Sequence, residues 1–244
     1  MTDRYFVETP ITGGEATLAG HEAHHLIRVM RASRGSRVVL FDGSGAEFNA
    51  RVERIGRGAV ELTILCRNEV DRELPLDLTL GVSLPKGDRQ RWLVEKAVEL
   101  GVKRLVPLVT ARSVARAWKK ALARLGRTVI EASKQCGRNR LMEIAQPQGW
   151  PEFVAATQTA PCRLLAHPEC PAAGAGESVT PAPREQVFEA VVLAVGPEGG
   201  FTPDEVSLAA TAGWHLVNLG PRILRTETAA ILLTSLALRG VTGR

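Results

Sequence analysis

Residues 190–205 have the sequence AVVLAVGPEGGFTPDE, which combines an apolar strand, a glycine-rich loop and the start of a helix. The apolar run from Ala190 to Val195 is typical of a buried strand. Thr202 to Glu205 forms a capping box with proline at the first helical position, so the start of the next helix is strongly specified. A strand that leads through a short loop into a helix is the repeating unit of parallel α/β folds.

The same alternation of strands and helices extends in both directions from this stretch. Strands are expected at residues 76–84, 104–110, 163–166, 190–195 and 215–219. Helices are expected at residues 88–100, 119–136, 203–212 and 226–239, and glycines at 101, 137 and 240 favour the ends of three of them. The pattern predicts an open, largely parallel sheet with helices on both faces. Residues 168–184, rich in small residues, are expected to form a surface insert.

The first 73 residues have a different pattern, with short strands expected at residues 37–41, 47–55 and 59–65. Residues 21–30 are compatible with one short helix. This part is therefore expected to be a small β-barrel with one helix. A charged stretch that ends at Pro75 marks the change of pattern, so we expect two domains, residues 1–73 and 74–244.

Composition excludes several classes of protein. The chain has 244 residues, 45% of them hydrophobic and 23% charged, which excludes a disordered or fibrous protein. Its four cysteines contain no CxxC pair, so neither a disulfide scaffold nor a zinc ribbon is supported. The most apolar run, residues 229–238, is shorter than the roughly 20 residues that a membrane span needs. We expect a cytoplasmic protein without a membrane segment, and no metal site, because the adjacent His24 and His25 lack a third ligand.

Positive charge is concentrated in the middle of the chain. Residues 74–148 contain 15 Lys and Arg against 6 Asp and Glu, a net charge of +9, whereas the segments before and after carry −1 and −3. A local excess of this size indicates a polyanionic partner such as nucleic acid, although solvated surface side chains remain the alternative.

Two loops at the expected carboxyl edge of the sheet point to a ligand site. They are Gly196–Gly200 and Leu219–Ala229, and ligands of parallel sheets bind at that edge. The chain has neither GxxxxGK[ST] nor GxGxxG, so a nucleoside triphosphate or a dinucleotide is not indicated. Loops of this kind offer backbone amides and carbonyls, which suits an adenosine-like ligand without phosphates. Tight turns between packed elements are the alternative.

Several segments of the chain resemble one known family, and they are residues 4–7, 24–31, 86–89, 94–102, 135–140, 196–200 and 219–229. In this order, and over nearly the whole length, the chain resembles the 16S rRNA uridine-N3 methyltransferases of the RsmE type in the SPOUT superfamily. GPEGG and LGxRILRxETA are the most specific of these motifs, with Pro221 at the variable position of the second. One departure is Leu141-Met142, where the family usually has Val-Pro.

The resemblance implies a fold and a function. The fold would be a PUA-like RNA-binding β-barrel followed by a SPOUT α/β domain with a C-terminal trefoil knot, in a homodimer. The activity would be methylation, from S-adenosylmethionine, of uracil N3 in 16S rRNA near the decoding site of the 30S subunit. A non-catalytic RNA-binding or ribosome-assembly factor on the same scaffold, and a small-molecule methyltransferase, are the alternatives.

The resemblance also assigns site residues. The cofactor would contact Gly196, Pro197, Gly199, Gly200, Leu219, Gly220, Ile223, Leu224, Thr226, Thr228 and Ala229. Glu198 is the candidate that removes the N3 proton, unless it only caps its own turn. Arg225 is the second catalytic candidate, which would hold the cofactor loop or a substrate phosphate. RNA would be contacted by Arg138, Asn139 and Arg140, and Lys86 and Arg89 could add phosphate contacts, with Arg112 and Arg116 as further candidates. Independently of the resemblance, His24, His25, Arg28 and Arg31 recur every three or four residues along one possible helix face, which indicates an accessory RNA surface, with a solvated face as the alternative.

Overall fold

The computed structural model describes residues 3–113, 118–168 and 188–239. The chain divides into two compact units, which are treated one at a time. The first contains the residues up to Glu73 together with Ile130–Leu141, and the second contains the remainder from Leu74. Most of the expected surface insert at 168–184, as well as Arg116 and Gly240, lie outside the described residues. None of the described helices is long and apolar enough to cross a membrane.

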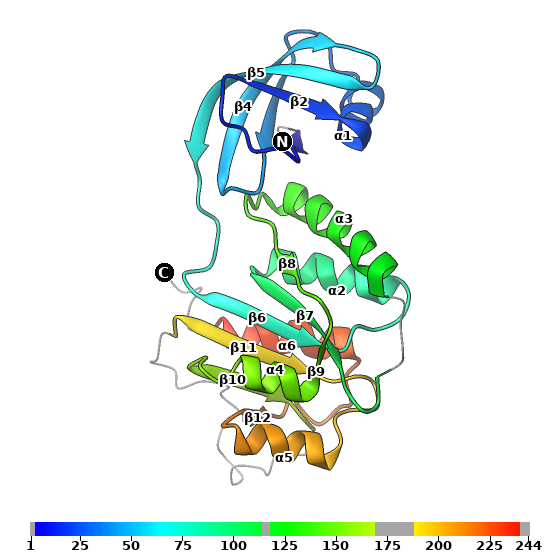
Figure 1. Cartoon of the computed structure of the whole chain (residues 1–244), viewed down its shortest axis with the longest axis vertical. Coiled ribbons are helices and arrows are strands. Elements are labelled where there is room, and N and C mark those ends of the chain that lie inside the picture. Colours follow the sequence, from blue (N-terminus) through cyan, green and yellow to red (C-terminus); the bar gives the residue numbers. More distant parts are fainter. Residues whose placement is uncertain (1–2, 114–117, 169–187, 240–244) are drawn as a thin grey trace. The chain divides into compact units, whose positions relative to one another are not determined.

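The first unit is built on a five-stranded sheet in the order β1-β3-β4-β5-β2 (Figure 1). Its strands are β1 (Arg4–Phe6), β2 (Glu15–Ala19), β3 (Arg37–Phe41), β4 (Ala46–Ile55) and β5 (Ala59–Glu69). Two register shifts in the β4–β5 pairing bend the strands, which curls the sheet into a half-barrel around its core. The three strands expected in this region are confirmed, whereas the pattern did not predict the short β1 and β2.

The helix expected at residues 21–30 is present in an altered form. It begins as the α-helix α1 (Gly20–His24) and continues as the π-helix η1 (His25–Val29), where the Met30 N–H donates to the His25 carbonyl at 3.1 Å. Ala23 and Leu26 anchor it in the core of the sheet. Because a π-turn rotates the following residues, side chains three or four positions apart no longer share one face.

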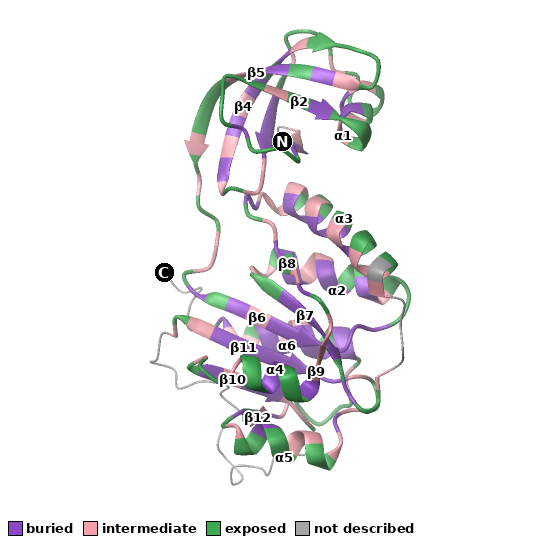
Figure 2. Ribbon diagram, viewed as in Figure 1, coloured by how far each residue is buried: buried purple, intermediate pink, exposed green. Residues whose placement is uncertain are grey.

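The second unit contains a sheet in which every pairing is parallel. The strand order is β12-β10-β11-β6-β7-β8, and β9 pairs separately with β7. The strands are β6 (Asp77–Val82), β7 (Arg104–Val109), β8 (Glu143–Ile144), β9 (Gln148–Gly149), β10 (Cys162–Ala166), β11 (Ala190–Val195) and β12 (His215–Val217). The expected parallel sheet is confirmed. Its central strands are buried along most of their length (Figure 2).

Helices cover both faces of this sheet, as the alternating pattern predicted (Figure 1). They are α2 (Asp88–Glu99), α4 (Trp150–Ala156), α5 (Pro203–Thr211) and α6 (Thr226–Ala237), whereas α3 (Trp118–Cys136) belongs to both units, since its residues from Ile130 onward are part of the first. Helix α6 packs on α2, β6 and β11, while α4 packs on α5 and β7. The sequence pattern did not predict the two-turn helix α4.

Candidate functional site

One cavity lies at the carboxyl ends of β12, β10 and β11, which are neighbours in the sheet. Its empty volume is about 670 Å³, part of which is open to solvent, within the usual range for small-molecule sites. The walls are Ala166, His167, Pro168, Val195, Gly196, Pro197, Glu198, Gly200, Phe201, Leu219, Gly220, Arg222, Ile223, Leu224, Thr226 and Ala229.

Most of the residues predicted to hold a cofactor line this cavity. Among those predicted, only Gly199 and Thr228 are absent from its walls. The prediction did not include His167, Pro168, Phe201 and Arg222. The first two directly follow β10, so the rule that ligands bind at the carboxyl ends of strands would have located them.

An aromatic cluster packs next to the first loop, Gly196–Gly200. The Phe201 ring packs against Trp150 in a tilted arrangement, with 4.6 Å between centroids and 44° between the ring planes. A Cβ atom at Gly196 would lie 3.0 Å from this ring, so any side chain there would force the ring to move by a few tenths of an ångström. The predicted capping box is present, because the Glu205 N–H donates to Thr202 Oγ1 at 3.3 Å and the Thr202 N–H to Glu205 Oε2 at 2.8 Å.

Hydrogen bonds connect the second loop, residues 218–225, and the start of the helix after it to the segment after β10 and to the first loop. Asn218 Nδ2 donates to the Pro168 carbonyl, and its Oδ1 accepts from the Gly220 N–H, both at 2.8 Å. Thr226 Oγ1 donates to the Gly196 carbonyl at 3.2 Å. Gly220 has φ +109°, which side chains rarely adopt. Ile223 lines the cavity while it is 96% exposed, so it offers apolar surface to a ligand.

Two carboxylates near the cavity share one arginine. Arg89 Nη2 lies 3.2 Å from Glu198 Oε1, and Nη1 lies 3.7 Å from Glu227 Oε2. The Glu198 side chain is 54% exposed and that of Glu227 only 8%. This geometry makes Arg89 a residue that orients the two carboxylates, a role that the sequence did not suggest. Arg225 lies exposed at the N-cap of α6, and Lys86 is exposed just before α2.

Of the other RNA candidates that the structure describes, Arg112 is exposed in the turn after β7, and the rest lie in the first unit, where they differ in burial. Arg28, Arg31 and Arg140 are exposed, whereas Arg138 and Asn139 are only 4% and 2% exposed. Arg138 forms a two-pronged ion pair with Glu73.

Asn139 is also held internally. Its Oδ1 accepts from Arg4 Nη2, and its Nδ2 donates to the Val70 carbonyl at 3.1 Å. The geometry gives Arg138 and Asn139 a structural role, because buried, paired groups are not presented to RNA. Of the run from 138 to 140, this leaves Arg140 exposed to solvent.

The same network includes Glu47, which accepts hydrogen bonds from Arg4 at 2.8 Å and Arg72 at 3.1 Å. Burial alone would raise the pKa of Glu47, but these two arginines hold it below its usual value. Because the pKa of Glu47 is lower in the folded protein than in the unfolded chain, Glu47 stabilises the fold at pH values above its unfolded pKa. That contribution is lost as the pH falls through the folded value.

Replacing Arg138 by Met is expected to lower the free energy of unfolding by about 3 kcal/mol, because it leaves the Glu73 carboxylate without its partner. Urea denaturation measures the change. The exposed neighbour gives a matched control, since Arg140→Met should change the stability by less than about 0.5 kcal/mol. A loss of RNA affinity without a loss of stability in Arg138→Met would contradict the structural role.

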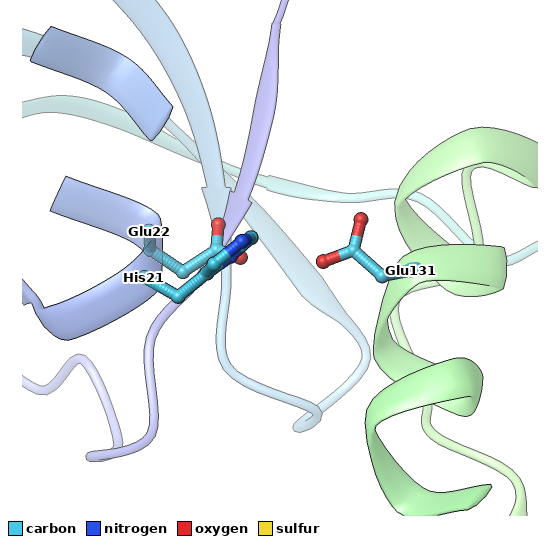
Figure 3. Close-up of side chains that lie close together, drawn as sticks. All are labelled: His21, Glu22 and Glu131. Atoms are coloured by element: carbon cyan, nitrogen blue, oxygen red, sulfur yellow. The ribbon is translucent and has the colours of Figure 1, made fainter. Parts of the chain in front are cut away.

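One group of potential metal ligands occurs in the first unit, formed by His21, Glu22 and Glu131 (Figure 3). Their ligand atoms lie within 4.8 Å of one another, and the side chains of α1 face that of α3. Lys134 Nζ lies 2.9 Å from Glu22 and 3.4 Å from Glu131, so an internal ammonium already compensates both carboxylates. The arrangement is accounted for by these ion pairs.

Comparison with family models gives two matches. Residues 72–238 match the RNA methyltransferase domain family, and residues 18–65 match the RNA methyltransferase PUA domain family. The chain is also 34% identical, over 216 residues, to the ribosomal RNA small subunit methyltransferase E of Synechocystis sp.. That match covers 87% of this chain and 69% of its relative.

Two solved structures are similar over almost the whole chain. A methyltransferase from Legionella pneumophila in complex with bound S-adenosylmethionine has a TM-score of 0.87. The ribosomal RNA small subunit methyltransferase E from Neisseria gonorrhoeae, bound to S-adenosylmethionine, has a TM-score of 0.83. Each is 32% identical to this chain, and each match covers 98% of this chain and 97% of the other.

Proposed function

Since the chain belongs to the ribosomal RNA small subunit methyltransferase E family, we propose that it transfers a methyl group from S-adenosylmethionine to N3 of one uridine in 16S rRNA. The proposed substrate is the assembled 30S subunit, near its decoding site. We further propose that it acts in the cytoplasm as a homodimer, with the β-rich part, residues 1–73, binding RNA and residues 74–244 forming a knotted SPOUT domain.

The cavity at the β10–β12 edge carries this proposal, because its walls suit S-adenosylmethionine. Backbone groups of two glycine-containing loops and the apolar side chains of Leu219, Ile223 and Leu224 can enclose an adenosine and a short aliphatic chain. Among the residues that the structure describes, its walls contain a single arginine and no lysine, which fits a nucleoside without phosphates. Gly199 and Thr228 would support the two loops from outside the cavity.

Glu198 is the proposed proton acceptor. S-adenosylmethionine, when bound, supplies an already activated methyl group, so the protein has to align N3 and remove its proton. The Glu198 carboxylate lines the cavity and is half exposed, which leaves it accessible to a base that approaches from solvent. Arg89 orients it from α2, and Arg225, at the start of α6, is proposed to hold a substrate phosphate.

RNA contacts are proposed for the exposed cations Arg28, Arg31, Lys86 and Arg140. Their guanidinium and ammonium groups can pair with phosphates, and base-specific recognition is not required of them. Because a paired or stacked uracil hides N3, the target base must leave its helix before it can react.

Labelled S-adenosylmethionine with unmodified 30S subunits, and in parallel with protein-free 16S rRNA, tests the function. We expect N3-methyluridine from the 30S subunit in nucleoside analysis of the product. Binding of S-adenosylmethionine without any transfer to either RNA would refute the substrate. No binding of S-adenosylmethionine would favour a non-catalytic RNA-binding or assembly factor.

A further inference from the structure

A second cavity, with an empty volume of about 590 Å³, adjoins the first at the carboxyl edge of the sheet. Pro197 and Glu198 line both cavities. The other walls come from Leu108 in β7, from residues that follow β6 and β7, and from Trp118 at the start of α3. The two cavities therefore meet at the residue proposed to accept a proton.

The floor of the second cavity offers one hydroxyl group, that of Ser83, with weak internal partners. Ser83, only 4% exposed, has its Oγ 3.4 Å from both the Leu108 carbonyl and Ser113 Oγ. Hydrogen bonds of this length are weak, so a ligand oxygen can replace them. Ser113 Oγ is itself held in place, because it accepts from the Thr110 N–H at 2.9 Å.

The remaining walls combine an aromatic ring with cations. Trp118 supplies the ring, and Lys86 and Arg112 supply positive charge. Arg112 Nη1 donates to the Gly199 carbonyl, and the neighbouring Ala111 N–H donates to Glu205 Oε1 at 2.8 Å. The first bond ties the turn after β7 to the glycine-rich loop, and the second ties the same turn to the first turn of α5, so two walls of the cavity are connected.

We infer that the second cavity receives the target uracil after it has left the RNA helix, with its ring on Trp118. Its carbonyl oxygens would accept hydrogen bonds from the hydroxyl groups of Ser83 and Ser113 and from the cations Lys86 and Arg112. This inference rests on the proposed function. Stacking on an indole holds any base, whereas the polar groups decide which base is favoured.

The polar groups of the cavity favour uracil over cytosine. Loss of the N3 proton spreads negative charge over O2 and O4, and hydroxyl and cationic donors stabilise that charge. Lys86 and Arg112 can only donate hydrogen bonds, so they fit two carbonyl oxygens better than the amino group of cytosine. Glu198, on the shared wall, is placed to take the proton.

Substitution of Trp118 tests the inference with two separate readouts. In Trp118→Ala we expect kcat/KM for 30S subunits to fall about tenfold or more, while the Kd for S-adenosylmethionine, measured by calorimetry, stays within about twofold. Trp118→Phe should recover most of the activity. Ser83→Ala should lower kcat/KM, and Ser207→Ala, exposed on α5, is the matched control that should not.

A spectroscopic readout tests binding without catalysis. The protein has four tryptophans, and the indole signal of Trp118 is the one missing from Trp118→Phe. With S-adenosylhomocysteine present, uridine 5′-monophosphate should shift this signal, and cytidine 5′-monophosphate should shift it less. An unmoved Trp118 signal would overturn the inference.

Three further outcomes separate this inference from the proposed function. If the wild-type protein methylates 30S subunits and Trp118→Ala is equally active, the inferred uracil site would be overturned, while the proposed function would stand. Parallel losses of S-adenosylmethionine affinity and activity would assign the cavity to the cofactor, and would also overturn it. Wild-type protein that transfers no methyl group would instead refute the proposed function.

Discussion

Glu198→Gln is expected to lower the rate of methyl transfer to 30S subunits by a factor of about 10² to 10⁴, the usual contribution of a general base. The amide keeps the shape of the side chain but cannot accept the N3 proton at neutral pH. The affinity for S-adenosylmethionine should change little, because backbone groups and apolar side chains make up most of that cavity. Single-turnover transfer with saturating cofactor measures the chemical step.

A matched control tests whether the loss of any nearby exposed carboxylate charge, and not that of Glu198 in particular, lowers the rate. Asp204 is an exposed carboxylate on the next helix that lines neither of the two cavities, so Asp204→Asn should keep the wild-type rate. A normal rate for Glu198→Gln would leave Glu198 with a structural role, as the partner of Arg89.

Gly220→Val is expected to weaken S-adenosylmethionine binding by up to about a hundredfold. Gly220 has φ +109° and lines the cavity, so a branched side chain forces the loop to change its backbone path. Strain of this kind costs about 1–3 kcal/mol, and each 1.4 kcal/mol corresponds to tenfold in affinity. Isothermal titration calorimetry measures the affinity directly.

Gly58→Val controls for the loss of stability that backbone strain causes by itself. Gly58 has φ +83°, open surroundings and a place between β4 and β5, in the first unit. The Gly58→Val variant should lower the melting temperature, as Gly220→Val does, and should leave the affinity for S-adenosylmethionine unchanged. Equal affinities in both variants would argue against a cofactor in the cavity at Gly220.

Local sequence patterns determined the architecture of the second unit and the position of its main cavity. The apolar run of β11, the capping box at Thr202 and the glycine-rich loop between them depend on neighbouring residues only. The structures predicted from these patterns are therefore present in the folded chain. The rule for the carboxyl ends of parallel strands then brings Gly196–Gly200 and the loop before Thr226 together, as the lining of the cavity shows.

The shortest elements could not be predicted in this way. Strands β1, β8 and β9 have two or three residues, too few for a period of two to be recognised. They become strands because a longer neighbour supplies the hydrogen-bonding partners. The helical spacing of the histidines and arginines at residues 24–31 did not indicate the π-turn that begins at His25, in which Leu26 packs into the core.

Tertiary structure alone decided which charged residues are exposed. Arg138 and Arg140 look equivalent in the sequence, yet Arg138 is buried against Glu73, 65 positions away. Likewise, Arg89 meets Glu198 and Glu227 only because α2, the loop after β11 and α6 converge. The second cavity is likewise formed by residues at the ends of three strands that are far apart in the chain. Burial and pairing depend on contacts between distant segments, and a single sequence does not contain the distances between them.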